Sequence, residues 1–257
     1  MIALTRAVSP HLAACELMEL ERVPIDAGRA AEQHRRYVQA LAQLGARIEA
    51  LAPLPEHPDG VFVEDTAVIL PEVAVITRPG VASRQAEVES TAVALARYRA
   101  LRRIEAPACL DGGDVLCIGR TLYVGLSRRS NAAGAAALAS AIAPFGYRVC
   151  PVRLRGCLHL KSAVSLIPPE RVLVNAGWVD PAIFTSASAI EVAADEPAAA
   201  NTLTLSRTTL VSSSYPRTVE RLEAEGIQVR QLEVDELHKA EAGITCMSLI
   251  LDESSAA

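Results

Sequence analysis

The apolar and polar positions of this chain fall into short runs that come in pairs. Residues 66–70 (TAVIL) and 73–77 (VAVIT) are mostly apolar, rich in valine, isoleucine and threonine, and separated only by Pro71 and Glu72. Two such runs around a short turn predict a β-hairpin. The pattern returns three more times, at 114–118 with 121–125, 162–167 with 171–175, and 201–205 with 208–212.

A fifth copy is divided between the two ends of the chain. Residues 246–251 (CMSLIL) form the last apolar run and residues 2–8 (IALTRAV) the first. We expect these two runs to pair and to close the chain on itself. The five copies begin near residues 66, 114, 162, 201 and 246, at intervals of 39 to 48 residues, a period typical of arrays and propeller-like rings.

Alanine-rich amphipathic stretches lie between the paired runs and predict helices. They span residues 27–44, 85–103, 131–145, 216–225 and, more weakly, 181–194. The repeating unit is therefore a hairpin, a helix and a further strand. No linker-like stretch interrupts it, so we expect one α/β domain over residues 1–257. An ordinary α/β sandwich with coincidental spacing is the alternative.

Composition narrows the possible partners and the compartment. The net charge is −5, which argues against a nucleic-acid or anionic-membrane partner. The first residues lack the pattern of a signal peptide, and no apolar run approaches the 18 or so residues of a membrane-spanning helix. The six cysteines include no CxxC pair. We expect reduced thiols in a cytoplasmic protein, with no structural zinc.

Chemically distinctive residues stand at the starts of four of the five copies. They are Glu64 and Asp65, the Asp-Gly-Gly-Asp motif at 111–114, His159 between two leucines, and Cys246. Each has an ordinary explanation when taken alone: a solvated strand end, a plain loop, a buried histidine and a buried thiol.

A closed ring would bring these starts together at one end of its axis. A thiol, an imidazole and a carboxylate would then meet as nucleophile, base and orienting acid. The carboxylate pair beside them would bind a cation, because buried carboxylates need a positive partner. Together these groups favour a planar, positively charged, electrophilic carbon, as in a guanidinium.

These motifs resemble those of the dimethylarginine dimethylaminohydrolases, members of the pentein, or guanidine-modifying, superfamily. The resemblance extends over nearly the whole chain. It rests on EQH with the residues that follow at 32–38, FVEDTAV at 62–68, ITRPGVASR at 76–84, LDGGDVL at 110–116, GLSRRSNAAGA at 125–135, LHLKS at 158–162, SSYPR at 213–217 and TCMSLI at 245–250. The most specific combination is LHLK with FVED and a C-terminal CMS, whereas DGGD alone is weak.

The resemblance implies a five-bladed ββαβ propeller with pseudo-fivefold symmetry and a reaction without metal or cofactor. Cys246 would attack the guanidino carbon of an Nω-methylated arginine and form a covalent thiouronium. His159 would protonate the departing methylamine or dimethylamine and then activate water, releasing citrulline. Asp111 would orient His159. The substrate cation would lower the pKa of Cys246 and so activate its own nucleophile.

The same resemblance assigns the remaining contacts to the substrate. Glu64 and Asp65 would bind the guanidinium, and Asp59 the α-amino group. Arg84 and Arg129 would hold the α-carboxylate, although surface ion pairs are the ordinary alternative for arginines. Backbone carbonyls at Leu17 and Ala240 would add further contacts. Residues 13–24, where a lid would lie, match the family poorly, which leaves the selectivity open.

Three other readings compete with this one. An arginine or agmatine deiminase would release ammonia, but relatives of that type are typically longer, and agmatine has no carboxylate for two arginines. A non-catalytic binding ring of the same fold would need no nucleophile. A zinc-dependent amidohydrolase would need clustered histidines, and the five histidines have no ligand-like spacing. We expect a small-molecule substrate and a monomer or homodimer.

Overall fold

The computed structural model describes residues 1–253 and shows an α/β protein built from small mixed sheets. Within these residues fifteen strands form five sheets of three strands each. In every sheet a central strand pairs antiparallel with one neighbour and parallel with the other. The four predicted internal hairpins are therefore confirmed.

The sheets follow the repeat along the chain. They comprise β3 (Ala67–Ile69), β4 (Val73–Ile76) and β5 (Ala100–Arg103); β6 (Val115–Ile118), β7 (Thr121–Leu126) and β8 (Arg148–Arg153); β9 (Val164–Ile167), β10 (Arg171–Val174) and β11 (Ser188–Glu191); β12 (Leu203–Leu205), β13 (Thr208–Ser212) and β14 (Gln228–Leu232); and β15 (Leu249–Leu251), β1 (Ile2–Thr5) and β2 (Arg47–Ala50).

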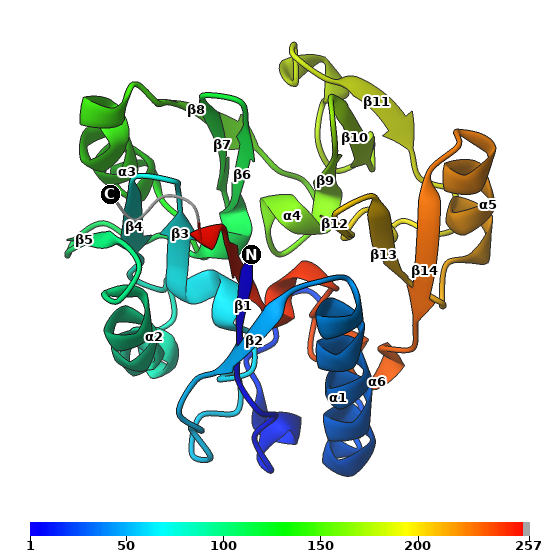
Figure 1. Cartoon of the computed structure of the whole chain (residues 1–257), viewed down its shortest axis with the longest axis horizontal. Coiled ribbons are helices and arrows are strands. Elements are labelled where there is room, and N and C mark those ends of the chain that lie inside the picture. Colours follow the sequence, from blue (N-terminus) through cyan, green and yellow to red (C-terminus); the bar gives the residue numbers. More distant parts are fainter. Residues whose placement is uncertain (254–257) are drawn as a thin grey trace.

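The four longer helices lie at the outer edge of the molecule, outside the sheets (Figure 1). They are α1 (Ala27–Gln43), α2 (Val88–Leu95), α3 (Ala132–Ile142) and α5 (Pro216–Ala224), and two single-turn helices are α4 (Leu160–Ala163) and α6 (Asp235–His238). The carboxylate of Asp26 caps α1 by accepting from the N–H of Arg29. Its buried face, with Ala30, Tyr37 and Leu41, packs into the core. None of the described helices is long and apolar enough to cross a membrane.

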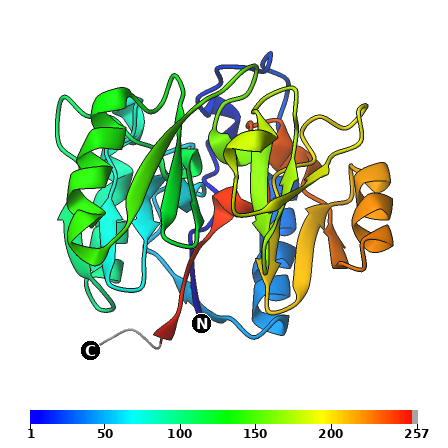
Figure 2. The ribbon, with the colours of Figure 1, turned by 90° about the horizontal axis from the view of Figure 1, so that it is seen from above.

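The chain ends pair as expected. Ile2 lies opposite Leu251 and Leu4 opposite Leu249 in an antiparallel ladder. Figure 2 shows β1 and β15 side by side through the middle of the molecule. The paired ends therefore build one complete sheet, although the expected domain over 1–257 includes residues 254–257, which lie outside the described part.

Two predicted helices were wrong in part or in full. Residues 85–103 hold a 3₁₀ turn (η3, Ala82–Glu87), α2 and then β5, which pairs parallel with β4. Residues 181–194 hold only a 3₁₀ turn (η6, Pro181–Ile183) followed by β11, which pairs parallel with β10. In both cases pairing with a neighbouring strand outweighed local helix propensity, which tertiary contacts often override.

The first strand of each repeat begins one to three residues later than predicted. Short helical turns occupy these starts: η2 (Val63–Thr66), η4 (Gly112–Asp114), α4 and η7 (Thr245–Met247). Glu64, Asp65 and Cys246 are part of such turns, and Asp111 and His159 directly precede them. Glu64, Asp65, Asp111, His159 and Cys246 therefore lie in or directly before short turns that precede the strands, and not within the strands themselves.

The terminal sheet provides a test of closure. Leu4 is fully buried between β15 and β2, whereas Leu20 is 51% exposed. We expect Leu4→Ala to lower the free energy of unfolding by about 2–5 kcal/mol, because it leaves a cavity in the core. Leu20→Ala should change it by less than about 0.5 kcal/mol. Chemical denaturation checks both, and equal losses would contradict the packing.

Candidate functional site

The turns at the strand starts converge on a small cavity. Seven of the residues singled out in the sequence line it, namely Asp59, Asp65, Arg84, Arg129, His159, Ala240 and Cys246. Phe62 and Leu158 supply apolar walls. The volume is about 20 Å³, enough for about one water molecule. A ligand the size of an amino acid therefore requires the cavity to open.

His159 is held between two carboxylates. Its Nε2 lies 3.2 Å from Oδ2 of Asp111, and its Nδ1 lies 3.9 Å from Oδ1 of Asp65. Burial opposes protonation, but the charges of Asp65 and Asp114 and the bond to Asp111 raise the pKa of His159 to about 9. The imidazole therefore carries a proton at neutral pH.

Glycines let these groups approach so closely. A Cβ on Gly113 would lie 2.7 Å from Oδ1 of Asp65 and 2.8 Å from Nδ1 of His159. The N–H of Gly113 donates to Asp65, and the N–H of Gly80 donates to Asp111. Neither Gly112 nor Gly113 has a positive φ. Close approach alone explains the Asp-Gly-Gly motif.

Cys246 faces the cavity as a half-buried thiol. The N–H of Gly243 donates to its Sγ at 3.3 Å. Burial raises the pKa of Cys246 far above its usual range, and the charges of Glu64 and Asp65 raise it further. The thiol is therefore neutral until a positive charge comes near it.

Asp65 joins the histidine to a buried arginine. Nη1 of Arg84 lies 2.6 Å from Oδ2 of Asp65, and the same guanidinium pairs with Glu87 at 2.9 Å. Burial alone would raise the pKa of Asp65, but the charges of His159 and Arg84 hold it below its usual range. Asp65 therefore stays ionised, and in this arrangement a guanidinium already occupies one of its oxygens.

Arg129 and Asp59 have unused capacity toward the cavity. Nη1 of Arg129 is buried without a hydrogen-bond partner and lies 3.7 Å from Oδ2 of Asp111. A buried donor without an acceptor is costly, so it favours an incoming anion. Burial raises the pKa of Asp59 to about 6, and its Oδ2 accepts from the N–H of Glu16.

Three of the residues predicted from the sequence, Glu64, Asp111 and Leu17, do not line the cavity. The carboxylate of Glu64 accepts from Nζ of Lys161 at 2.8 Å and from the hydroxyl of Thr245 at 2.6 Å. Leu17 is partly buried and packs against the hydrophobic core. Their contacts to a substrate stay predictions.

Three residues important to the site were given no role in the prediction from the sequence. Asp114 accepts from the N–H of Leu160 and so fixes the turn that carries His159. Asn201 bonds both the N–H and the hydroxyl of Thr245, beside Cys246. The position of Asn201 at the start of the fourth repeat, equivalent to the other four starts, was the signal available.

Glu241 is the third of these residues, and it holds part of the segment 13–24, where a lid is expected. Its Oε1 accepts from the N–H groups of Met18, Glu19 and Leu20 at 2.6 to 2.9 Å. Its backbone has a φ of +59°, which non-glycine residues rarely adopt. Nη1 of Arg128 holds the carbonyl of Met18 from the other side. These contacts must break when the cavity opens.

His159 and its two acidic neighbours, Asp65 and Asp111, are enough side chains to be considered as a metal site. One ligand atom from each of Asp65, Asp111 and His159 lies within 4.8 Å of the others. However, Arg84 and Arg129 already stand beside the two carboxylates. A divalent ion would therefore face two fixed positive charges at short range, so these residues do not favour a metal.

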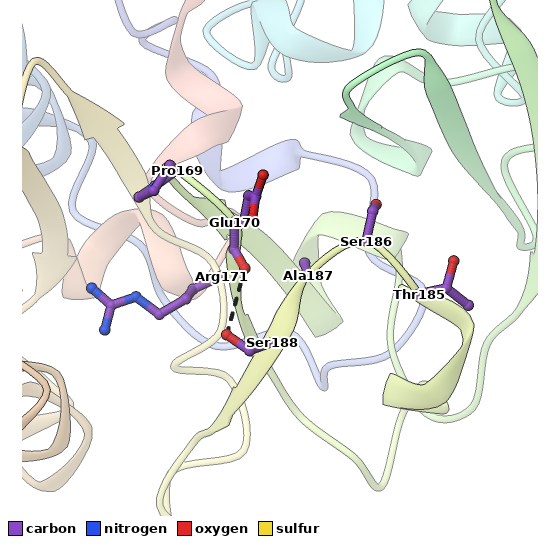
Figure 3. A pocket seen from close by; sticks show the side chains of 7 residues that line it. All are labelled: Pro169, Glu170, Arg171, Thr185, Ser186, Ala187 and Ser188. Atoms are coloured by element: carbon purple, nitrogen blue, oxygen red, sulfur yellow. Dashed lines mark hydrogen bonds between the residues drawn. The ribbon is translucent and has the colours of Figure 1, made fainter.

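A wider hollow of about 630 Å³ lies elsewhere, at the edge of the sheet β9–β10–β11 (Figure 3). Pro169, Glu170 and Arg171 form one wall, and residues 185–188 form the other. The hydroxyl of Ser188 donates to the carbonyl of Glu170, which joins the two walls. The lining of this hollow contains neither cysteine nor histidine. The larger volume of the hollow therefore does not make it the better candidate for the reactive site.

The proton on His159 makes stability depend on pH. Its pKa rises from the ordinary 6.5 to about 9 on folding, so the native state binds the proton more tightly. The stabilisation should be complete below about pH 6.5 and be lost as pH rises through about 9. Unfolding free energies of the wild type and His159→Gln should therefore converge between these values. Parallel pH curves would contradict this assignment.

Comparisons with known proteins agree with this geometry. No family model matches the chain. It is 39% identical over 253 residues to the N(G),N(G)-dimethylarginine dimethylaminohydrolase of Streptomyces coelicolor, covering 98% of this chain and 97% of that protein. The enzyme of the same name from Pseudomonas aeruginosa is 34% identical over 87% of this chain and 89% of its own length.

A solved structure of the Pseudomonas aeruginosa protein, a cysteine-to-serine mutant complexed with citrulline, superposes with a TM-score of 0.91 at 31% identity. The match covers 96% of this chain and 97% of that one. The chain described here belongs to the dimethylarginine dimethylaminohydrolase family.

Proposed function

We propose that this protein hydrolyses Nω-methylated arginines to citrulline and methylamine or dimethylamine, with Cys246 as the nucleophile. The observation that carries the proposal is the meeting of a thiol, a protonated imidazole and an ionised carboxylate in one closed cavity. The citrulline held by the solved relative fits the product.

The charges of the site residues suit the first step. A substrate guanidinium beside Cys246 would lower the pKa of the thiol, whose proton leaves to solvent. The thiolate then adds to the guanidino carbon. His159 gives its proton to the departing amine, whose C–N bond breaks, and a thiouronium on Cys246 remains.

The second step returns the site to its starting state. Neutral His159 takes a proton from water, and the hydroxide adds to the thiouronium carbon. The C–S bond breaks, Cys246 leaves as thiolate, and citrulline forms after the loss of one proton. Asp111 holds His159 in place through Nε2 in both steps.

The proposed substrate contacts follow from which site residues can form further hydrogen bonds or ion pairs. The substrate guanidinium would displace Arg84 from Asp65, since both are the same chemical group. The freed Arg84 and the unpartnered Nη1 of Arg129 would then bind the α-carboxylate. Asp59 would bind the α-amino group. The remaining contacts proposed from the resemblance are Glu64 with the guanidinium, and the backbone carbonyls of Leu17 and Ala240.

We also propose that the five sheets form the closed, pseudo-fivefold propeller of the pentein fold as a single domain. The support is the same three-stranded arrangement in every sheet, the outer helices and the pairing of β1 with β15. In such a ring the strand starts of all repeats face one end of the axis, where the cavity lies.

The decisive test compares substrates and products. We expect asymmetric dimethylarginine and monomethylarginine to yield citrulline with dimethylamine or methylamine, in preference to arginine yielding ammonia. Cys246→Ser should reduce turnover more than about 1,000-fold. Chelator treatment should leave turnover unchanged. Preferred release of ammonia from arginine, full activity of the serine variant, or activity lost to chelator and restored by zinc would refute the proposal.

The close packing at Gly113 gives a separate prediction. Gly113→Ala should lower kcat by about 100-fold, because the added methyl group must push Asp65 and His159 apart. Gly28→Ala is the control, since its Cβ would meet only the side chain of Asp26, at 3.3 Å. Steady-state kinetics and circular dichroism of both variants test this, and wild-type kcat in Gly113→Ala would contradict it.

A further inference from the structure

A second cavity, of about 400 Å³, lies beside the catalytic one and has no part in the proposed chemistry so far. Its lining combines aromatic, acidic and small residues. They are Glu19, Leu20, Gly156, Cys157, Leu158, Ser162, Trp178, Ala198, Asn201, Tyr215, His238, Glu241, Ala242 and Gly243.

The wall between the two cavities is thin. Leu158, Glu241 and Ala242 line both of them. Gly243 lines the second cavity, and its N–H donates to Sγ of Cys246 in the first. Leu158 also directly precedes His159, the proposed proton donor. A movement of this single layer would therefore connect the reacting atoms to the second cavity.

The opposite side of the second cavity reaches solvent. Glu19, Leu20, Gly156 and Ala198, all on its lining, are exposed. The catalytic cavity, in contrast, has room for about one water molecule. The second cavity thus offers a path to solvent beside the catalytic cavity.

The chemistry of the lining suits a small organic cation. Trp178, Tyr215 and His238 are aromatic, and the rings of Tyr215 and His238 stack with centroids 5.4 Å apart. Burial lowers the pKa of His238 to about 4, so this ring is neutral. Although the chain has 23 arginines, the lining contains no arginine or lysine, and it carries two glutamates. Methylated ammonium ions bind to aromatic faces beside negative charge.

The proposed reaction produces such a cation. The amine leaves with one proton from His159 and, with a pKa near ~10, takes a second proton from solvent. It must depart before water can attack the thiouronium, because the catalytic cavity cannot hold both. We propose that the second cavity binds the methylated ammonium product and is its route of release. This inference rests on the proposed function.

The first experiment measures binding without turnover. Trp178 is the only tryptophan of the chain, so its fluorescence reports directly on this cavity. Dimethylammonium chloride should change the emission of the wild-type protein saturably, with a dissociation constant of about 1 mM, near the limit for a ligand of three heavy atoms. Ammonium chloride and isopropanol, a neutral molecule of similar shape, should bind at least about tenfold more weakly.

The second experiment fills the cavity. Ala198 and Ala136 are both exposed alanines, but only Ala198 lines the cavity, and Ala136 lies on α3. We expect Ala198→Phe to weaken dimethylammonium binding about tenfold and to lower kcat more for dimethylarginine than for monomethylarginine. Ala136→Phe should match the wild type in both respects.

Two results would overturn the inference. One is an emission of Trp178 that does not change saturably or responds equally to isopropanol. The other is unchanged kcat for dimethylarginine in Ala198→Phe. A failure of the proposed function is recognised separately, because it abolishes release of dimethylamine in the wild type while fluorescence binding of dimethylammonium is measured without substrate.

Discussion

The pairing of His159 with two buried carboxylates is the interaction on which the rest of the site depends. Burial would raise the pKa of Asp65 if His159 and Arg84 were not beside it, and the pKa of His159 is raised by Asp65, Asp114 and Asp111. Arg84 lies beside Asp65 and Arg129 beside Asp111, and these two positive charges balance the charge of the carboxylates. Because all these groups are buried, removing one of them would leave an uncompensated charge.

The same balance explains why the nucleophile can rest unreactive. Burial and the charges of Glu64 and Asp65 raise the pKa of Cys246, so these surroundings favour the neutral thiol. The charge that would activate it belongs to the substrate. In the structure Arg84 occupies the position of that charge at Asp65. An enzyme arranged in this way ties nucleophilicity to the arrival of a guanidinium and thereby limits side reactions of the thiol.

The two cavities divide the task of binding from that of release. The catalytic cavity holds the arginines suited to a carboxylate and lies under a lid fastened by Glu241. The neighbouring cavity has no basic lining residue and presents aromatic faces. Glu241 lines both cavities and also binds the lid. The residue that holds the lid is therefore part of the wall that the two cavities share. An opening of the lid and a shift of the wall are therefore mechanically linked.

The sequence by itself determined the repeat, the four internal hairpins, the pairing of the chain ends and the residue types at the repeat starts. These features follow from local periodicity and turn chemistry, which are written in neighbouring residues. It placed helices wrongly at 100–103 and 181–194, where pairing with β4 and β10 decided the structure. Only the tertiary structure decided that Arg84 pairs with Asp65, that Glu64 turns toward Lys161, and that Glu241 holds the lid. Such contacts join residues up to 223 positions apart, and their distances depend on how the sheets pack, which no local pattern contains.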